Sequence, residues 1–189
     1  MGKIDEMTET ESKRVVIDAS IAGAAGGEAA TYSTSINCTN FLNVFYLDTD
    51  LIMVMTLEIR GEWKEHRSNF AYTFLANMVS DDRICSIQED DLLEIRKLKS
   101  KMDPIPLRKK LREDLEKDFI LIEAALATDK TVISLDDKAR KGFEQISQEL
   151  KKLRSIVWVN PDRHIEAVLS WLKDGANPVE EYRLGFRSG

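Results

Sequence analysis

Several groups that would identify a common protein class are scarce in this 189-residue chain. Its two cysteines, Cys38 and Cys85, lie far apart without metal-ligand spacing, so we expect reduced, buried thiols rather than disulfides or a zinc site. No apolar run approaches the roughly 20 residues that a membrane span requires. The polar, acidic start resembles neither a signal nor a transit peptide. These absences predict a cytoplasmic protein with no membrane partner.

Motifs for phosphate cradles and protein nucleophiles are also missing. Gly26 and Gly27 fit neither the dinucleotide fingerprint nor the P-loop, which ends in Gly-Lys-Ser/Thr. The chain has no G-x-S-x-G elbow, and neither cysteine accompanies a histidine motif. We therefore expect no dinucleotide or NTP site and no covalent catalysis through serine or cysteine.

The overall composition is that of an ordinary folded domain, with 43% hydrophobic and 32% charged residues. A net charge of −6 argues against a general nucleic-acid coat protein, because phosphate binding depends on Lys and Arg. It does not exclude a nuclease, since an acidic metal site would itself supply several of these charges. Residues 1–13 have few apolar positions and are predicted to be a disordered tail.

The central stretch of the chain is 118–140. It begins with Asp118 at the head of an apolar helical run, turns at 128–130, and continues as a β-branched strand that ends before Asp136 and Asp137. Ligands of open α/β sheets bind at the carboxyl ends of the strands. This stretch therefore predicts carboxylates at a binding edge.

A second strand near the start of the chain ends in the same way. Residues 14–20, RVVIDAS, form an apolar β-branched run that ends in Asp18 and is followed by Ser20, a candidate helix N-cap. If the two strands are parallel, Asp18 and Asp136 meet at one edge of the sheet.

Strands and helices alternate along the remainder of the chain, which predicts an α/β fold, a three-layer α/β/α sandwich with a mostly parallel sheet. The other expected strands cover 51–56, 84–87 and 156–159. The expected helices cover 36–47, 57–79, 90–101, a segment from 107 that bends or restarts near Asp118, 138–153, and one after Pro161 that reaches Leu172.

The sequence VVIDAS at 15–20, the stretch DFILIEAALATDKTVISLDD at 118–137 and an acidic helix between them resemble the PIN-domain nuclease superfamily. The resemblance implies a five-stranded sheet of order 3-2-1-4-5. It assigns 14–160 to the nuclease domain and leaves 161–189 as a C-terminal helix and tail that pack on or extend it. It also implies that three or four carboxylates gather around a divalent metal.

Carried onto this chain, the resemblance assigns catalysis and binding of Mg²⁺ or Mn²⁺ to Asp18, Glu62, Asp118 and Asp136. Glu62 is chosen because the family places a glutamate in the helix after the second strand, and Glu58, one turn earlier, is the alternative. Asp137 is an additional or substitute ligand. We interpret His66 as a surface residue, because Mg²⁺ prefers oxygen ligands.

Supporting roles fall to neighbouring polar residues. Ser20 or Ser134 is expected to orient a carboxylate or a water molecule. Substrate phosphates are expected to contact Lys138, Arg140 and Lys141, which follow the acids directly. The basic residues within 108–112 are a second candidate, with an ordinary solvated helix face as the equal alternative.

The sequence therefore predicts a metal-dependent endoribonuclease acting on single-stranded or structured RNA. The superfamily includes the toxins of toxin–antitoxin pairs as well as related PIN proteins, so an antitoxin protein and a second copy of the chain join RNA as candidate partners. The alternative is a catalytically silent RNA- or protein-binding module. A haloacid dehalogenase-like phosphatase is rejected, because Ser20 stands where that family has a second aspartate.

Overall fold

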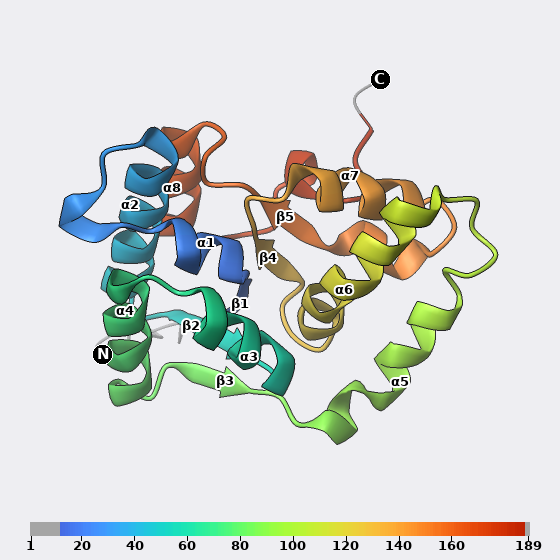
Figure 1. Ribbon diagram of the computed structural model, residues 1–189, viewed down its shortest axis with the longest axis horizontal. Helices are drawn as coiled ribbons and strands as arrows, with labels where there is room; N and C mark the ends of the chain where they lie inside the picture. The colour runs from blue at the N-terminus through green and yellow to red at the C-terminus, as the bar shows by residue number, and fades with distance from the viewer. Residues whose placement is uncertain (1–11, 188–189) are drawn as a thin grey trace, which may run out of the picture.

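The computed structural model describes residues 12–187, so the tail predicted for 1–13 lies mostly outside the described residues. A five-stranded, all-parallel sheet of order β3-β2-β1-β4-β5 forms the middle layer, with helices on both faces (Figure 1). This arrangement confirms the predicted α/β/α sandwich and the order 3-2-1-4-5. The strands are β1 (Lys13–Ile17), β2 (Leu51–Met55), β3 (Ile84–Ser86), β4 (Thr131–Ile133) and β5 (Val157–Val159).

The central strands are buried because helices cover both faces of the sheet. Val15, Val16 and Ile17 of β1 have no exposed surface, and Val132 and Ile133 of β4 have none either. A parallel sheet covered on both faces produces continuous apolar runs rather than alternation. The β-branched runs in the sequence therefore correspond to strands.

Eight α-helices occur among residues 12–187. They are α1 (Ala19–Ala24), α2 (Ser33–Leu47), α3 (Leu57–His66), α4 (Asn69–Ser80), α5 (Glu89–Ser100), α6 (Lys109–Leu126), α7 (Asp137–Ile146) and α8 (Ile165–Lys173).

The single helix predicted for 57–79 is wrong, because α3 ends at His66 and α4 begins at Asn69. Ser68 causes the break: its hydroxyl accepts the Ala71 N–H as a helix N-cap, and its backbone N–H donates to the carbonyl of Ala22. The apolar ladder continues through the break, so hydrophobic periodicity did not show it.

Three other boundaries differ from the prediction. Ser20 lies inside α1, and Asp18 occupies the N-cap position without a capping bond from its side chain. Helix α6 is continuous through Asp118. Helix α7 stops at Ile146, and a separate 3₁₀ turn covers Lys151–Ser155. The Arg154 side chain donates to the carbonyl of Ser147, the C-cap residue of α7. This carbonyl therefore has a hydrogen-bond donor although the helix does not continue.

The segment after Pro161 contributes to the same core. Helix α8 packs beside α2 (Figure 1), and its Val168 and Leu172 are buried. Further on, Leu184 is buried, and its N–H donates to the Ile156 carbonyl. Over residues 12–187, the helices are too short or too polar to traverse a lipid bilayer.

Candidate active site at the carboxyl edge of the sheet

Asp18 follows β1 directly, and two serines hold its carboxylate. The hydroxyls of Ser20 and Ser134 both donate to Oδ2 of Asp18, at 2.5 and 2.7 Å. The Ser20 hydroxyl also accepts the N–H of Leu135 at 3.2 Å. Both serines therefore orient Asp18, the role predicted for them. Oδ1 of Asp18 accepts no hydrogen bond from residues 12–187 and stays available to a ligand.

Asp136 is tied to the same serine and also begins α7. Its N–H donates to the Ser134 hydroxyl at 3.0 Å, so Ser134 links the two acids that follow β1 and β4. Oδ1 of Asp136 accepts the N–H groups of Lys138 and Ala139, both at 2.8 Å, as the N-cap of α7. The second oxygen has no hydrogen-bond donor within the part of the chain that the structure describes.

Asp118 faces this pair from α6. No residue between 12 and 187 donates a hydrogen bond to its carboxylate, which is only partly exposed. Burial, followed by the negative charges of Asp136, Asp18, Asp114 and Glu62, raises the pKa of Asp118 to about 7. A carboxyl group in such surroundings retains a proton near neutral pH unless a cation compensates the repulsion.

Glu62 reaches the same neighbourhood because α3 is anchored to β1. The indole N–H of Trp63 donates to the carbonyl of Ile17 at 2.8 Å, one residue before Asp18. The Glu62 carboxylate is 52% exposed and lies 3.5 Å from the His66 ring. Its negative charge is the smallest of the contributions that raise the pKa of Asp118.

The alternative glutamate, Glu58, belongs to a different cluster. Arg96 of α5 forms ion pairs with Glu58, Glu89 and Glu123, which come from three helices. This arginine holds α5 against α3 and α6. Of the two candidates, Glu62 is therefore the one that lacks an arginine partner among the described residues.

Asp137, predicted as an additional or substitute ligand, is engaged by two other residues. Its two oxygens accept from the Asn160 amide at 3.0 Å and from the Arg163 guanidinium at 3.0 Å. Burial acts against ionisation, but the bonds from Asn160 and Arg163 outweigh it and lower the pKa of Asp137. We therefore exclude it from the candidate site.

A hollow of about 370 Å³ adjoins Asp118 and Asp136. Its basic lining residues are Arg108, Lys110 and Lys138. Lys138, predicted to contact substrate phosphates, thus lies beside two of the candidate acids. Lys141 is exposed and does not line this hollow.

Two arginines expected near the substrate have structural partners instead. Arg140 pairs with Glu144 at 2.8 Å and donates to the Glu181 carbonyl. Arg112 donates to the carbonyls of Met102, Asp103 and Ile105, and so fixes the loop before α6. The predicted role of Arg140 in substrate binding does not agree with these contacts.

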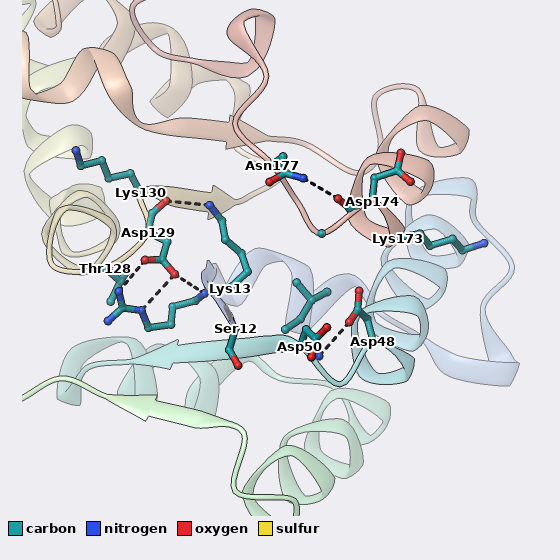
Figure 2. A pocket seen from close by; sticks show the side chains of 13 residues that line it. Ser12, Lys13, Asp48, Asp50, Thr128, Asp129, Lys130, Lys173, Asp174 and Asn177 are labelled. Atoms are coloured by element: carbon teal, nitrogen blue, oxygen red, sulfur yellow. Dashed lines mark hydrogen bonds and ion pairs between the residues drawn. The ribbon is translucent and has the colours of Figure 1, made fainter. Parts of the chain in front are cut away.

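A larger hollow, of about 1200 Å³, lies at the opposite edge of the sheet (Figure 2). It is lined by residues at the starts of strands, including Lys13 and Leu51. Three of its charged residues contact one another, since Arg14 pairs with Asp129 at 2.7 Å and Lys13 donates to the Asp129 carbonyl. None of the candidate acids lines it.

The four acids supply the oxygen ligands that Mg²⁺ and Mn²⁺ prefer. Within residues 12–187, however, no three Asp, Glu, His or Cys side chains are already arranged to hold a metal ion. The carboxylates therefore lie at the same edge of the sheet but do not form a complete coordination sphere. Their chemistry and their mutual repulsion fit a hard divalent cation, which would draw them together.

Two features of the site were not predicted. The Trp63 bond to Ile17 fixes α3, although the sequence indicated only an apolar core position. Asp114 adds its charge to Asp118 from one turn earlier in α6. The four-residue spacing of these two acids on a helix was the signal that could have found it.

Comparison with known proteins identifies no relative: no family model, no curated protein and no solved structure matches this chain.

Proposed function

We propose that this protein is a divalent-metal-dependent endoribonuclease. The observation that carries the proposal is the meeting of Asp18, Asp118 and Asp136 at one edge of the sheet. The negative charge of Glu62 also contributes to the raised pKa of Asp118. Burial and like charge together raise the pKa of Asp118 to about 7, which is typical of a carboxylate cluster that a cation neutralises.

Each side chain has a role in this proposal. Asp18, Glu62, Asp118 and Asp136 would hold Mg²⁺ or Mn²⁺, which when bound acidifies a water molecule and neutralises charge on the phosphate oxygens. Ser20 and Ser134 keep Asp18 oriented. Lys138, Arg108 and Lys110 line the adjoining hollow and would bind the phosphates on either side of the cleaved bond.

The sequence resemblance to PIN-domain nucleases supports the same reaction and RNA as the substrate. It also suggests a toxin of a toxin–antitoxin pair, with an antitoxin protein as partner. The second candidate function is a silent RNA- or protein-binding module. The absence of a preformed three-ligand metal site among residues 12–187 favours it.

A cleavage assay on a panel of labelled RNAs tests the proposal. Wild-type protein should cleave RNA with Mg²⁺ or Mn²⁺ and stop when EDTA is added. Asp18→Asn should lose at least a hundredfold in rate. Asp137→Asn is the matched control, because Asp137 is engaged by Asn160 and Arg163, and should retain most activity.

The outcomes separate the two candidate functions. Cleavage that persists in Asp18→Asn, or that needs no metal, would overturn the nuclease proposal. RNA binding without cleavage under any metal would support the silent module instead.

A further inference from the structure

The two outer strands of the sheet differ in how their free edges are covered. Beyond β5 the same chain closes the edge, since Val157 and Arg183 form an antiparallel bridge and the N–H of Leu184 donates to the Ile156 carbonyl at 2.9 Å. All three residues of β5 are buried. Beyond β3, at the other edge, none of residues 12–187 pairs with the strand. Figure 1 shows β3 at the margin of the molecule, between α4 and α5.

The hydrogen bonds between β3 and β2 show which backbone groups of β3 face outward. The carbonyl of Arg83 accepts an N–H of β2 at 3.0 Å, and the N–H of Ile87 donates to a carbonyl of β2 at 2.9 Å. Successive residues of a strand direct their N–H and C=O groups to alternate sides. The N–H and C=O groups of Ile84 and Ser86 therefore face away from β2, where an added strand could bond to them.

The apolar side chains around β3 are only partly covered. Ile84, Cys85 and Ile87 pack against the core but keep part of their surface exposed. Val54, in the neighbouring strand β2, has no exposed surface. A further strand would place side chains beside the three partly exposed residues and remove apolar surface from water.

Acidic side chains stand at both ends of β3. Five exposed acids flank the strand: Asp81 and Asp82 before it, and Glu89, Asp90 and Asp91 after it. Asp81 accepts the Tyr46 hydroxyl, and Glu89 pairs with Arg96. The side chains of the other three have no ion-pair partner in the described part of the chain. The strand itself, Ile84–Ser86, carries no charge.

We propose that β3 accepts an extended segment of a partner protein as a sixth strand, and that this segment carries Lys or Arg on both sides of an apolar centre. Its backbone bonds to the N–H and C=O groups of Ile84 and Ser86, as peptides do when they extend a sheet. Its basic ends lie beside the acids that flank β3. The site uses none of the candidate active-site residues and does not depend on the proposed nuclease function.

Charge repulsion argues against a second copy of this chain as the occupant. Pairing of two β3 edges, in either direction, would place the acids that flank one strand against those that flank the other. Proteins that block an exposed edge commonly place charged side chains on the edge strand itself. Here the charges lie beyond the strand, so they select a basic partner without blocking the backbone groups.

Calorimetric titration of the purified full chain with synthetic peptides tests the proposal. The nine-residue peptide KKVTVTVKK should bind at least tenfold more tightly than KKVTPPVKK, in which two adjacent prolines remove backbone donors. The acidic peptide EEVTVTVEE should bind at least tenfold more weakly than KKVTVTVKK. In the complex, the amide protons of Ile84 and Ser86 should exchange with solvent at least tenfold more slowly.

Two substitutions of Ser86 test the backbone contact. Ser86→Pro removes an N–H that β2 does not use, and edge strands tolerate proline where the N–H faces solvent. It should weaken binding of KKVTVTVKK at least tenfold. Ser86→Ala is the matched control, because it keeps the N–H, and should leave the dissociation constant within twofold. Thermal melts establish that both variants are folded.

Neutralising the flanking acids tests the selection of a basic partner. The double variant Asp82→Asn/Asp90→Asn should weaken binding of KKVTVTVKK at least fivefold at 50 mM salt. Asp82 has φ 55°, a conformation that asparagine tolerates. The control Glu149→Gln/Glu166→Gln removes the same charge from exposed residues after α7 and on α8, and should leave the constant within twofold.

The outcomes decide the proposal without RNA or metal. Equal affinity for KKVTVTVKK and KKVTPPVKK would overturn strand addition, because it would mean that the peptide backbone makes no contribution. Binding that Ser86→Pro leaves intact would overturn the placement at β3. A control double variant that weakens binding as much as Asp82→Asn/Asp90→Asn would show that only the overall charge attracts the peptide.

Discussion

The Ser134 hydroxyl donates to Oδ2 of Asp18 at 2.7 Å, although the two residues are 116 positions apart in the chain. The same hydroxyl accepts the N–H of Asp136. One buried serine therefore fixes the distance between the acids that follow β1 and β4.

Replacing Ser134 by alanine should disturb both acids. The change removes two hydrogen bonds, each worth about 1 kcal/mol of the free energy of unfolding. RNA cleavage should fall about 10- to 100-fold, as when a group that orients a metal ligand is removed. Chemical unfolding and cleavage rates provide the two measurements. Ser100→Ala, which removes an exposed hydroxyl bonded within its own helix, should change neither. Full activity in Ser134→Ala would show that Asp18 needs no such support.

The two glutamates of α3 should respond differently to substitution. Glu62→Gln should lower the cleavage rate at least a hundredfold, because it removes a carboxylate that acts on Asp118. Glu58→Gln should leave cleavage nearly intact and lower the melting temperature slightly, since its partner is Arg96. Parallel rate measurements and melts distinguish the two. The reverse result would assign the ligand to Glu58.

Asp118 should make the metal-free protein less stable as pH rises. Its pKa is about 7 in the folded state, against 3.8 in its ordinary state, so the folded protein holds this proton more tightly than the unfolded chain does. The stabilisation is complete below pH 4 and is lost as pH rises through 7. In EDTA, Asp118→Asn should therefore melt above wild type at pH 8, and the difference should vanish near pH 4. If the melting temperatures of the two proteins differed by the same amount at every pH, the prediction would be wrong.

Metal should reverse that loss of stability. A cation that binds only the folded state at a hundredfold excess over Kd adds about 2.7 kcal/mol to the free energy of unfolding. Mg²⁺ or Mn²⁺ should raise the melting temperature of wild type at pH 8, and Asp118→Asn should respond less. The comparison is made at constant ionic strength, so that screening does not imitate binding. An unchanged wild-type melt would mean that the acids form no common site.

Two glycines should respond in opposite directions to alanine. Gly61 lies inside α3, and a Cβ there meets no atom within 4 Å, so Gly61→Ala should stabilise the protein by about 0.5–1 kcal/mol. Gly142 in α7 packs against Leu115, whose methyl carbon would be 2.6 Å from the new Cβ. Gly142→Ala should therefore destabilise. Denaturant titration measures both changes, and a loss of stability in Gly61→Ala would reveal a close contact to Gly61.

Sequence reasoning recovered the sheet because its strands are buried on both faces. Continuous β-branched runs such as Val15–Ile17 have few other interpretations. The strand order depended on the family resemblance, since periodicity carries no information about which strands are neighbours. The meeting of Asp18 with Asp136 followed from that order.

Sequence reasoning failed where a charged side chain binds a different partner from the one expected. Asp136 and Asp137 are adjacent and identical, and their contacts distinguish them: Asp136 bonds to Ser134, whereas Asp137 is engaged by Asn160 and Arg163, more than 20 residues later. Arg140 was expected to bind substrate, but Glu144 lies one turn away and pairs with it. The contacts of Asp137 are tertiary and leave no periodic trace in the sequence, whereas the four-residue spacing of Arg140 and Glu144 on α7 could have predicted their ion pair.

The position of β1 has a consequence for synthesis. β1 pairs with β2 on one side and with β4 on the other, so its first neighbour leaves the ribosome long before its second. A nascent chain that ends after α5 can form the β1–β2–β3 half of the sheet but lacks Asp118, Ser134 and Asp136. Because α6 and β4 lie in the second half of the chain, the acids can meet only late in translation. Fragments released early would therefore carry Asp18 without the three residues that surround it in the complete fold.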